Sequence, residues 1–426
     1  MGETRKLFSN SLIVIVGTVV ASIFSYLFNM LMGRYLGPEQ YGEMTALMSL
    51  LMIVSVAGGA ILTITMRYSA ELYSAGKIGA LKKMFAIFSR YVYMLAFSII
   101  LVLLVLIKPI ASYFSITNLV PIVIAFSSLI FGLVMSVNKG LLQGGQKFVA
   151  TSLVGILEMA LRLGLGILLV KIGFEVSGAL LAIVVATAVS YLATFFPIKS
   201  ILRDSAGDKS AKDHLFDKRE IINYSLPTLI SAVLLVVALN IDVILVKHYF
   251  PPFEAGSYAA VSTIAKIILY VTSPIAAVMF PMISERATKG DKHYTIFFFS
   301  LIFVVVGSLV ILGVYVIAPA KVISLLYGNQ YIGYYYLLPE IGLAFVLYSL
   351  INLMANYYMV VKDFAFLWFF ALALILEIVA ISFLHSSVIL VVRIIVLSLS
   401  LLFVLFFGYY LVSKKEQIKL FLQGKY

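Results

Sequence analysis

The chain has 426 residues, of which 63% are hydrophobic and 12% are charged, and its formal net charge is +12. Soluble domains usually carry about 25% charged residues, so this composition excludes an ordinary soluble globular protein. The absence of Cys excludes disulfides and thiolate metal sites. The basic residues lie in short segments between apolar runs, a pattern typical of membrane topology signals rather than of nucleic-acid binding.

Apolar runs long enough to cross a bilayer as helices recur along the whole sequence. In lipid, every backbone N–H must be satisfied internally, so helices are the default spanning form. The sequence therefore predicts an all-α integral membrane protein with about twelve transmembrane helices. The predicted spans are 9–33, 42–66, 85–107, 118–141, 149–171, 176–198, 221–247, 255–280, 294–317, 332–361, 364–384 and 387–412.

The stretch Gly33–Leu50, GRYLGPEQYGEMTALMSL, is predicted to contain the end of one span, a tight turn at Gly37–Pro38 and the start of the next span. A similar stretch, KHYFPPFEAGSYAAVSTI, begins at Lys247, about half the chain later. Matches at nearly the same offset continue downstream, including Pro121 with Pro339 and Asn138 with Asn356. These matches predict two copies of one six-span unit.

The most charged segment falls between the two predicted copies. The expected division is an N-terminal six-helix bundle over 1–198, a charged cytoplasmic linker over 199–220, a C-terminal bundle over 221–412 and a basic tail over 413–426. If both termini are cytoplasmic, the cytoplasmic segments contain most of the 31 Lys and Arg residues. This distribution predicts a multi-pass protein of the cell membrane with the N- and C-termini inside.

Charged residues within the spans are candidates for function, because a charge at mid-bilayer costs about 2.5–3.5 kcal/mol on insertion scales. Glu158 and Arg162 are four residues apart and are predicted to share a helix face. They form either a self-neutralised structural pair or a site in which Arg162 binds phosphate and Glu158 tunes it. Lys266 has no acid one turn away, so it either contacts an anionic substrate or extends toward the membrane surface.

Asp242 and Glu340 are candidates for binding a coupling cation, with a structural hydrogen-bonding role as the alternative for Asp242. Glu377 and Arg393 lie on the last two predicted spans and are expected to form a structural ion pair. All four positions are in predicted helices.

Arg34 and Arg67 lie at the ends of the first two predicted spans, and both are candidate cavity residues for binding the substrate. Arg67 is a candidate for meeting a phosphate at the cytoplasmic side, although a topology anchor is the ordinary interpretation. The four His residues have no metal-ligand spacing, so no metal site and no cofactor are expected.

Three stretches resemble the polysaccharide-exporter branch of the MOP superfamily, which contains the O-antigen-type flippases of lipid-linked oligosaccharides. They are GRYLGPEQYGEMTALMSL, NIDVILVKHYFPPFEAGSYAAVSTIAKI and NKGLLQGGQKF. The resemblance implies a MATE-like fold of two six-helix bundles around a cationic cavity. It also implies alternating access and a glycan linked to isoprenyl pyrophosphate as the substrate.

The function predicted from the sequence is a flippase that moves lipid-linked oligosaccharide across the membrane, with H⁺ or Na⁺ as the candidate coupling ion. A cation-coupled MATE-type exporter of small amphipathic molecules is the alternative. A membrane-embedded glycosyltransferase or polymerase is disfavoured, because the outer connections are short and contain few acids. The protein is therefore predicted not to be an enzyme and not to bind nucleic acid.

Overall fold

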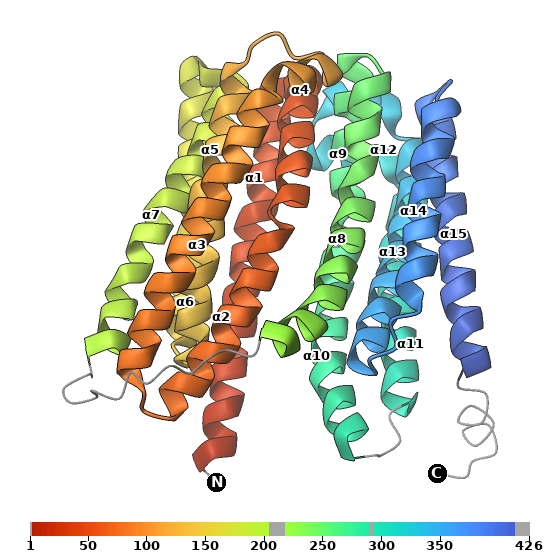
Figure 1. The fold of residues 1–426 in the computed structure, drawn as a ribbon. Helices are drawn as coiled ribbons and strands as arrows, with labels where there is room; N and C mark the ends of the chain where they lie inside the picture. The colour runs from red at the N-terminus through yellow and green to blue at the C-terminus, as the bar shows by residue number, and fades with distance from the viewer. Residues whose placement is uncertain (1, 204–217, 290–293, 414–426) are drawn as a thin grey trace. The chain divides into compact units, whose positions relative to one another are not determined.

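The chain is almost entirely helical over the residues that the structure, a computed structural model, describes (Figure 1). These residues are 2–203, 218–289 and 294–413, and none of them forms a strand. The side chains described are those of 16–203, 226–286 and 294–413. Most of the predicted linker 199–220 and nearly all of the predicted tail 413–426 lie outside the described residues.

The chain divides into two compact units, Met1–Leu229 and Ile230–Tyr426. The first unit contains α1 (Gly2–Val54), α2 (Val56–Ser74), α3 (Ile78–Val105), α4 (Ile107–Tyr113), α5 (Val120–Gly144), α6 (Phe148–Leu169), the π-helical turn η1 (Val170–Phe174), α7 (Glu175–Arg203) and the start of α8 (Lys218–Tyr249). The second unit contains the rest of α8, then α9 (Pro252–Ala265), α10 (Ile267–Lys289), α11 (Tyr294–Ile317), α12 (Pro319–Leu326), the 3₁₀ turn η2 (Asn329–Tyr334), α13 (Leu337–Val360), α14 (Phe366–Phe383) and α15 (Val388–Ser413).

Ten helical segments among the described residues are long and apolar enough to cross a membrane. Two of them, Val16–Ser74 and Phe148–Arg203, have 59 and 56 residues, so each is long enough for two spans. Each is interrupted by a glycine in the left-handed region, Gly37 with φ 75° and Gly173 with φ 94°. The predicted turn at Gly37–Pro38 is thus confirmed, and the segments account for about twelve spans.

Helices α5 and α2 pack closely against each other in the first unit. Gly140 and Gly144 of α5 form a G-x-x-x-G pair, and they face Thr65 and Ser69 of α2. A Cβ added at Gly144 would lie 2.5 Å from the Ser69 Cβ and 2.6 Å from the Met66 carbonyl oxygen. The two helices can therefore approach this closely only because both glycines lack a side chain.

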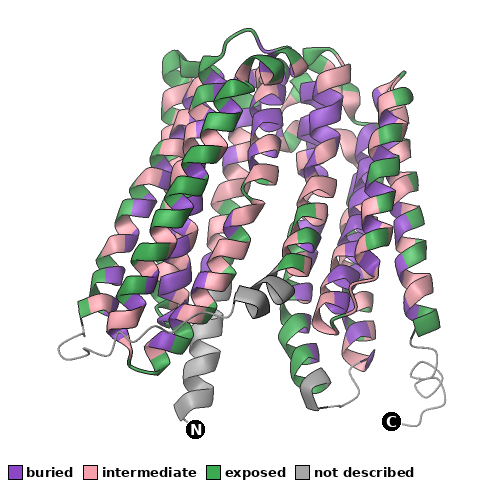
Figure 2. Cartoon of the chain, in the orientation of Figure 1, coloured by how far each residue is buried: buried purple, intermediate pink, exposed green. Residues whose placement is uncertain are grey.

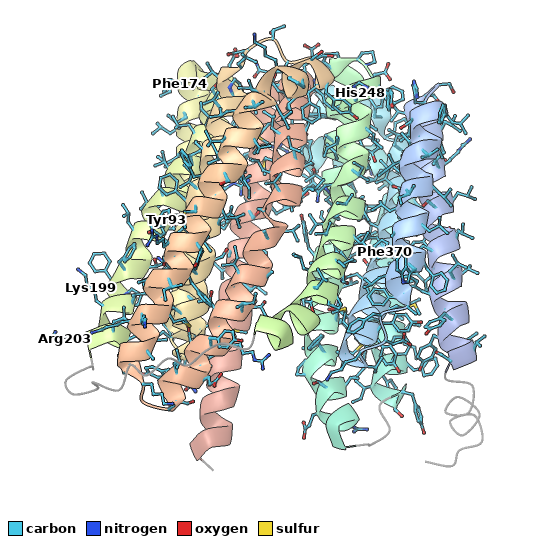
Figure 3. The ribbon with its side chains drawn as sticks, viewed as in Figure 1. Tyr93, Phe174, Lys199, Arg203, His248 and Phe370 are labelled. Atoms are coloured by element: carbon cyan, nitrogen blue, oxygen red, sulfur yellow. The ribbon has the colours of Figure 1, made fainter. Side chains whose placement is uncertain are left out.

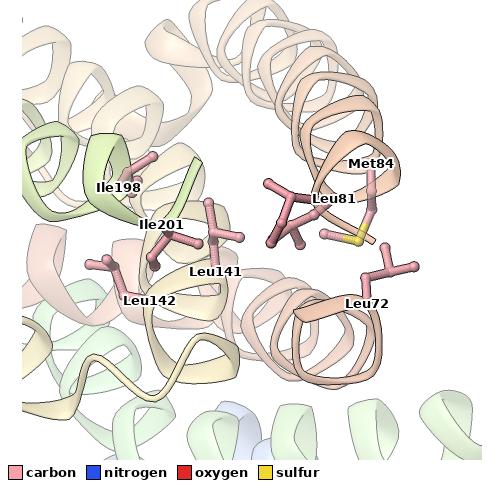
Figure 4. Close-up of a cluster of buried hydrophobic side chains, with 8 residues drawn as sticks. Leu72, Leu81, Met84, Leu141, Leu142, Ile198 and Ile201 are labelled. Carbon is pink, nitrogen blue, oxygen red and sulfur yellow. The ribbon is translucent and has the colours of Figure 1, made fainter. Parts of the chain in front are cut away.

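One end of the first unit is closed by a cluster of buried aliphatic side chains from α2, α3, α5 and α7 (Figure 4). Its labelled members are Leu72, Leu81, Met84, Leu141, Leu142, Ile198 and Ile201. Lys199 and Arg203 lie at this same end of α7, whereas Phe174 lies near its other end (Figure 3). The cytoplasmic location of the linker that follows stays a prediction from its basic residues.

The second unit is built around α13. In the most apolar 18-residue stretch of this helix, 72% of the residues are buried (Figure 2). This helix packs against α9, α10, α11 and α15. In the first unit α5 is the most buried span, at 56%, and it packs against α2, α3 and α7. Since Pro121 and Asn138 of α5 match Pro339 and Asn356 of α13, the same repeated element forms the centre of each unit.

The outward faces of the helices are apolar. Val105, Phe196, Ile317, Trp368 and Phe383 are each about four-fifths exposed. Exposed apolar surface on this scale marks a surface that meets lipid or a partner in place of water. Together with the length of the helices, it identifies the chain as a multi-pass membrane protein.

Candidate functional site

A half-buried ion pair links α5 to α6 in the first unit. The Nζ of Lys139 lies 3.1 Å from Oε2 of Glu158, and the Thr187 hydroxyl of α7 lies 3.4 Å from the other carboxylate oxygen. The sequence left two alternatives for Glu158 and Arg162, a self-neutralised pair or a phosphate site. Among the described residues Glu158 forms its ion pair with Lys139 and not with Arg162, so the self-neutralised pair is wrong. The Glu158 side chain is directed toward α5 and α7, where Lys139, which is distant in sequence, is available as a partner.

Arg162 is held by an aromatic ring. Its Cζ lies 4.4 Å from the centroid of the Phe28 ring of α1, and its Nη2 lies 3.6 Å from the Met48 sulfur. Gly166 leaves room for this arrangement, because a Cβ there would lie 2.7 Å from the Phe28 ring. A guanidinium stacked on an aromatic face keeps donor groups at its edge. The half-buried Arg162 is therefore suited to bind an anion such as phosphate.

Lys266 occupies the break between α9 and α10 in the second unit. It has no ion pair within 4.0 Å in the described part of the chain, although Asp242 lies within electrostatic range. At the break the Lys266 N–H still bonds the Ser262 carbonyl at 3.0 Å, and the hydroxyl of Tyr315 donates a 2.8 Å hydrogen bond to the Ile264 carbonyl. The half-buried Lys266 side chain thus lies within a membrane-spanning segment.

Asp242 of α8 is 6% exposed and accepts two hydrogen bonds on one oxygen. Tyr258 donates at 2.7 Å and Ser262 at 3.1 Å, both to Oδ2. The other oxygen, Oδ1, is buried and has no hydrogen-bond partner among the described residues. Asp242 and Tyr258 line a cavity of about 20 Å³ within the second unit. That volume accommodates about one water molecule or a small cation.

Glu377 of α14 is 3% exposed and lies within electrostatic range of Asp242. Arg393, its predicted partner, instead binds Glu340 with both guanidinium contacts at 3.3 Å. The predicted Glu377–Arg393 ion pair is therefore wrong. The physical reason is orientation, since Glu377 faces the interior of the second unit whereas the Arg393 side chain is 65% exposed.

The Arg393–Glu340 pair should contribute little to stability, because an exposed ion pair in water contributes only about 0–1 kcal/mol. Replacing Arg393 with Gln should lower the melting temperature of the purified protein by no more than a few degrees, about the shift expected from 1 kcal/mol. A thermal melt in detergent measures this. A loss as large as that expected for a buried pair would show that Arg393 has a further role.

A family profile described as polysaccharide biosynthesis protein matches residues 7–287. The chain belongs to this family. A search of curated proteins finds no significant match.

Solved structures of transporters have the same fold as this polysaccharide biosynthesis protein. An inward-facing multidrug resistance MATE transporter of the MOP superfamily is similar at a TM-score of 0.77 and 14% identity, over 93% of this chain and 97% of that one. The lipid II flippase MurJ in an inward closed conformation is similar at a TM-score of 0.70 and 15% identity, over 95% of this chain and 87% of that one. A MOP superfamily transporter from Pyrococcus furiosus, described as having a binding pocket of reversed polarity, is similar at a TM-score of 0.62 and 17% identity, over 93% of each chain. The MATE-like fold predicted from the sequence is confirmed.

Arg34 and Arg67 are exposed in this family member. Arg34 lies three residues before the Gly37 turn, and Arg67 lies within α2, which extends past the predicted span end at 66 to Ser74. No group of His, Asp and Glu with metal-binding geometry occurs among the described residues.

Sequence reasoning missed Lys139 as a site residue. The count of basic residues by segment places it on the cytoplasmic side, yet it lies inside α5, five residues before its last residue Gly144. A signal was present, because residue 139 falls within the predicted span 118–141. A cation inside a span requires a partner, and Glu158 on the next span was the nearest acid in sequence.

Proposed function

We propose that this protein is a flippase that carries a lipid-linked oligosaccharide across the cell membrane by alternating access, for polysaccharide biosynthesis. The family match and the fold shared with transporters, a lipid II flippase among them, support this function. A polar glycan cannot cross hydrocarbon unaided. A transporter that shields the glycan while the isoprenyl tail stays in lipid removes this barrier.

The observation that carries the proposal is the ammonium of Lys266, placed at a helix break with no ion pair among the described residues. A cation in a membrane span is costly unless it meets water or an anion. The pyrophosphate of an isoprenyl-linked glycan supplies that anion for Lys266, and the half-buried Arg162 of the first unit is assigned separately to binding phosphate. Lys266 and Arg162 are thus the residues we assign to phosphate. The exposed Arg67 is assigned to its arrival and the exposed Arg34 to its release.

Replacing both Arg162 and Lys266 with Gln should slow flipping of a fluorescent isoprenyl-pyrophosphate glycan in proteoliposomes by about 10- to 100-fold, because hydrogen bonds to charged groups contribute about 1.5–3 kcal/mol. Lys321→Gln, at an exposed position on α12, is the matched control and should flip at the wild-type rate. Unchanged flipping by the double variant would rule out the cationic site.

We further propose that Asp242 and Glu377 bind the coupling ion, either H⁺ or Na⁺, with both termini of the chain on the cytoplasmic side. Two nearby buried carboxylates resist simultaneous ionisation unless a proton or cation neutralises them. The unpartnered Oδ1 of Asp242 and the cavity beside it suit such an ion. Glu340, the other candidate, binds Arg393 and is assigned a structural role.

The same acidic pair favours a second candidate function, a cation-coupled exporter of small amphipathic molecules. Ion-driven efflux of a cationic dye from proteoliposomes, lost in Asp242→Asn, would support this function. Glycan flipping by the same preparation without dye efflux would support the flippase instead.

A further inference from the structure

A groove of about 430 Å³ opens in the first unit between α1, α5 and α6. This volume is in the range of small-molecule sites, about 300–1,000 Å³. The lining residues include Ser22 and Ser25 of α1, Gln143 of α5, and Ser152 of α6. Among the described residues that line the groove none is charged, and several have hydroxyl or amide groups.

Four polar side chains of this groove have no hydrogen-bond partner in the described part of the chain, whereas the Thr151 hydroxyl bonds the Lys147 carbonyl at 3.2 Å. Ser and Thr side chains on membrane helices usually donate to a carbonyl one turn back, as Ser127 and Ser128 do here at 2.6 Å. The side chains of Ser22, Ser25, Ser152 and Gln143 form no hydrogen bond with the described part of the chain. Their donors and acceptors therefore serve water or a ligand.

The groove leads to Arg162. Ser25 and Phe28 are three residues apart on α1, and Met159 and Arg162 are three apart on α6, so each pair lies on one helix face. The Arg162 guanidinium in turn stacks on the Phe28 ring. Neutral hydroxyls followed by a cation match a ligand in which a polyhydroxylated part adjoins an anionic group.

We propose that this groove binds a sugar ring of the transported head group, next to the phosphate held by Arg162. The proposal rests on the proposed function and deepens it. Sugar hydroxyls both donate and accept hydrogen bonds, as do the Ser hydroxyls and the Gln143 amide. Met159 and Phe148 supply apolar contacts for the C–H faces of the ring, and Gly155 leaves space for it.

The test measures binding by the full-length protein in nanodiscs of farnesyl pyrophosphate and of the same lipid bearing one N-acetylglucosamine. The wild type should prefer the sugar-bearing probe by about tenfold or more, and Ser22→Ala/Ser25→Ala/Ser152→Ala should reduce this preference to about twofold or less. Affinity for the sugar-free probe should not change. Gln143→Leu, on α5, should reduce the preference in the same direction.

The matched control is Ser98→Ala/Ser127→Ala/Ser128→Ala, whose hydroxyls bond their own helix backbone. It should keep the wild-type preference. Equal affinity of the wild type for both probes, or a preference that survives in the groove variants, would overturn the proposal.

Failure of the proposed function has a different signature. In that case neither pyrophosphate probe binds, and the groove is tested with uncharged farnesyl glucoside against farnesol. A preference for the glucoside that the groove variants lose supports a sugar site without a flippase. No preference overturns the sugar site as well.

Discussion

Replacing Gly144 with Leu should abolish folding of the first unit or lower its melting temperature by at least about 6 °C, the shift that 3 kcal/mol produces in a unit of this size. A Cβ at this position would lie within 2.8 Å of the Met66 carbonyl oxygen and of the Ala70 backbone nitrogen. Overpacking costs about 1–3 kcal/mol where side chains can adjust, and backbone atoms of a packed helix cannot rotate away. We therefore expect a loss of at least about 3 kcal/mol, measured by fluorescence-detected size-exclusion chromatography after heating.

The control is Gly132→Leu, on the same helix α5. Nothing lies within 4 Å of the Cβ that would be added at Gly132, so the larger side chain meets open space. Leu also has a higher helix propensity than Gly, so this variant should be as stable as the wild type or more stable. A Gly144→Leu protein that melts at the wild-type temperature would show that α2 and α5 do not pack backbone to backbone at this position.

Replacing Asp242 with Asn should remove the dependence of flipping on an ion gradient. The Asn side-chain oxygen can still accept the hydrogen bonds from Tyr258 and Ser262, so local packing is retained while the charge is lost. Coupling free energies between sites are typically about 1–3 kcal/mol, so gradient-driven flipping should fall by about 5- to 150-fold. The rate without a gradient should change little.

The measurement uses proteoliposomes with an imposed Na⁺ gradient at equal pH, and separately with a pH gradient in Na⁺-free buffer. The ion whose gradient accelerates the wild type is the coupling ion. Asp363→Asn is the matched control, because this carboxylate bonds Tyr409 and the Ala365 backbone at the turn between α13 and α14. Gradient dependence that persists in Asp242→Asn, or is absent from the wild type, would contradict the assignment.

The spans and the first turn followed from the sequence because membrane insertion depends on local composition. Hydropathy over about twenty residues decides whether a segment can span lipid. Gly37–Pro38 then decides where the chain reverses, since Gly adopts the left-handed φ and Pro stops the preceding hydrogen-bond pattern. Both signals reside in neighbouring residues, so neither required knowledge of the packing.

The ion pairs did not follow from the sequence, because they depend on how each helix is rotated against its neighbours. Lys139 and Glu158 are on different helices, as are Arg393 and Glu340, and no local spacing relates them. The i, i+4 rule favoured Glu158 with Arg162, but it gives only a few tenths of a kcal/mol. The ion pair of Glu158 with Lys139 of α5 forms in place of the i, i+4 pair. The break at Lys266 was equally hidden, since it contains neither Gly nor Pro.

The repeated element at the centre of each unit has a consequence for how this protein can change. The scaffold of α5 and α13 is shared by both copies, whereas the ionisable residues of the other helices have diverged, with Arg162 in one copy and Lys266, Asp242 and Glu377 in the other. Both acids assigned to the coupling ion lie in the second copy, so substitutions that alter the energy source would fall in one half of the chain. Substitutions that alter phosphate binding would fall in both halves.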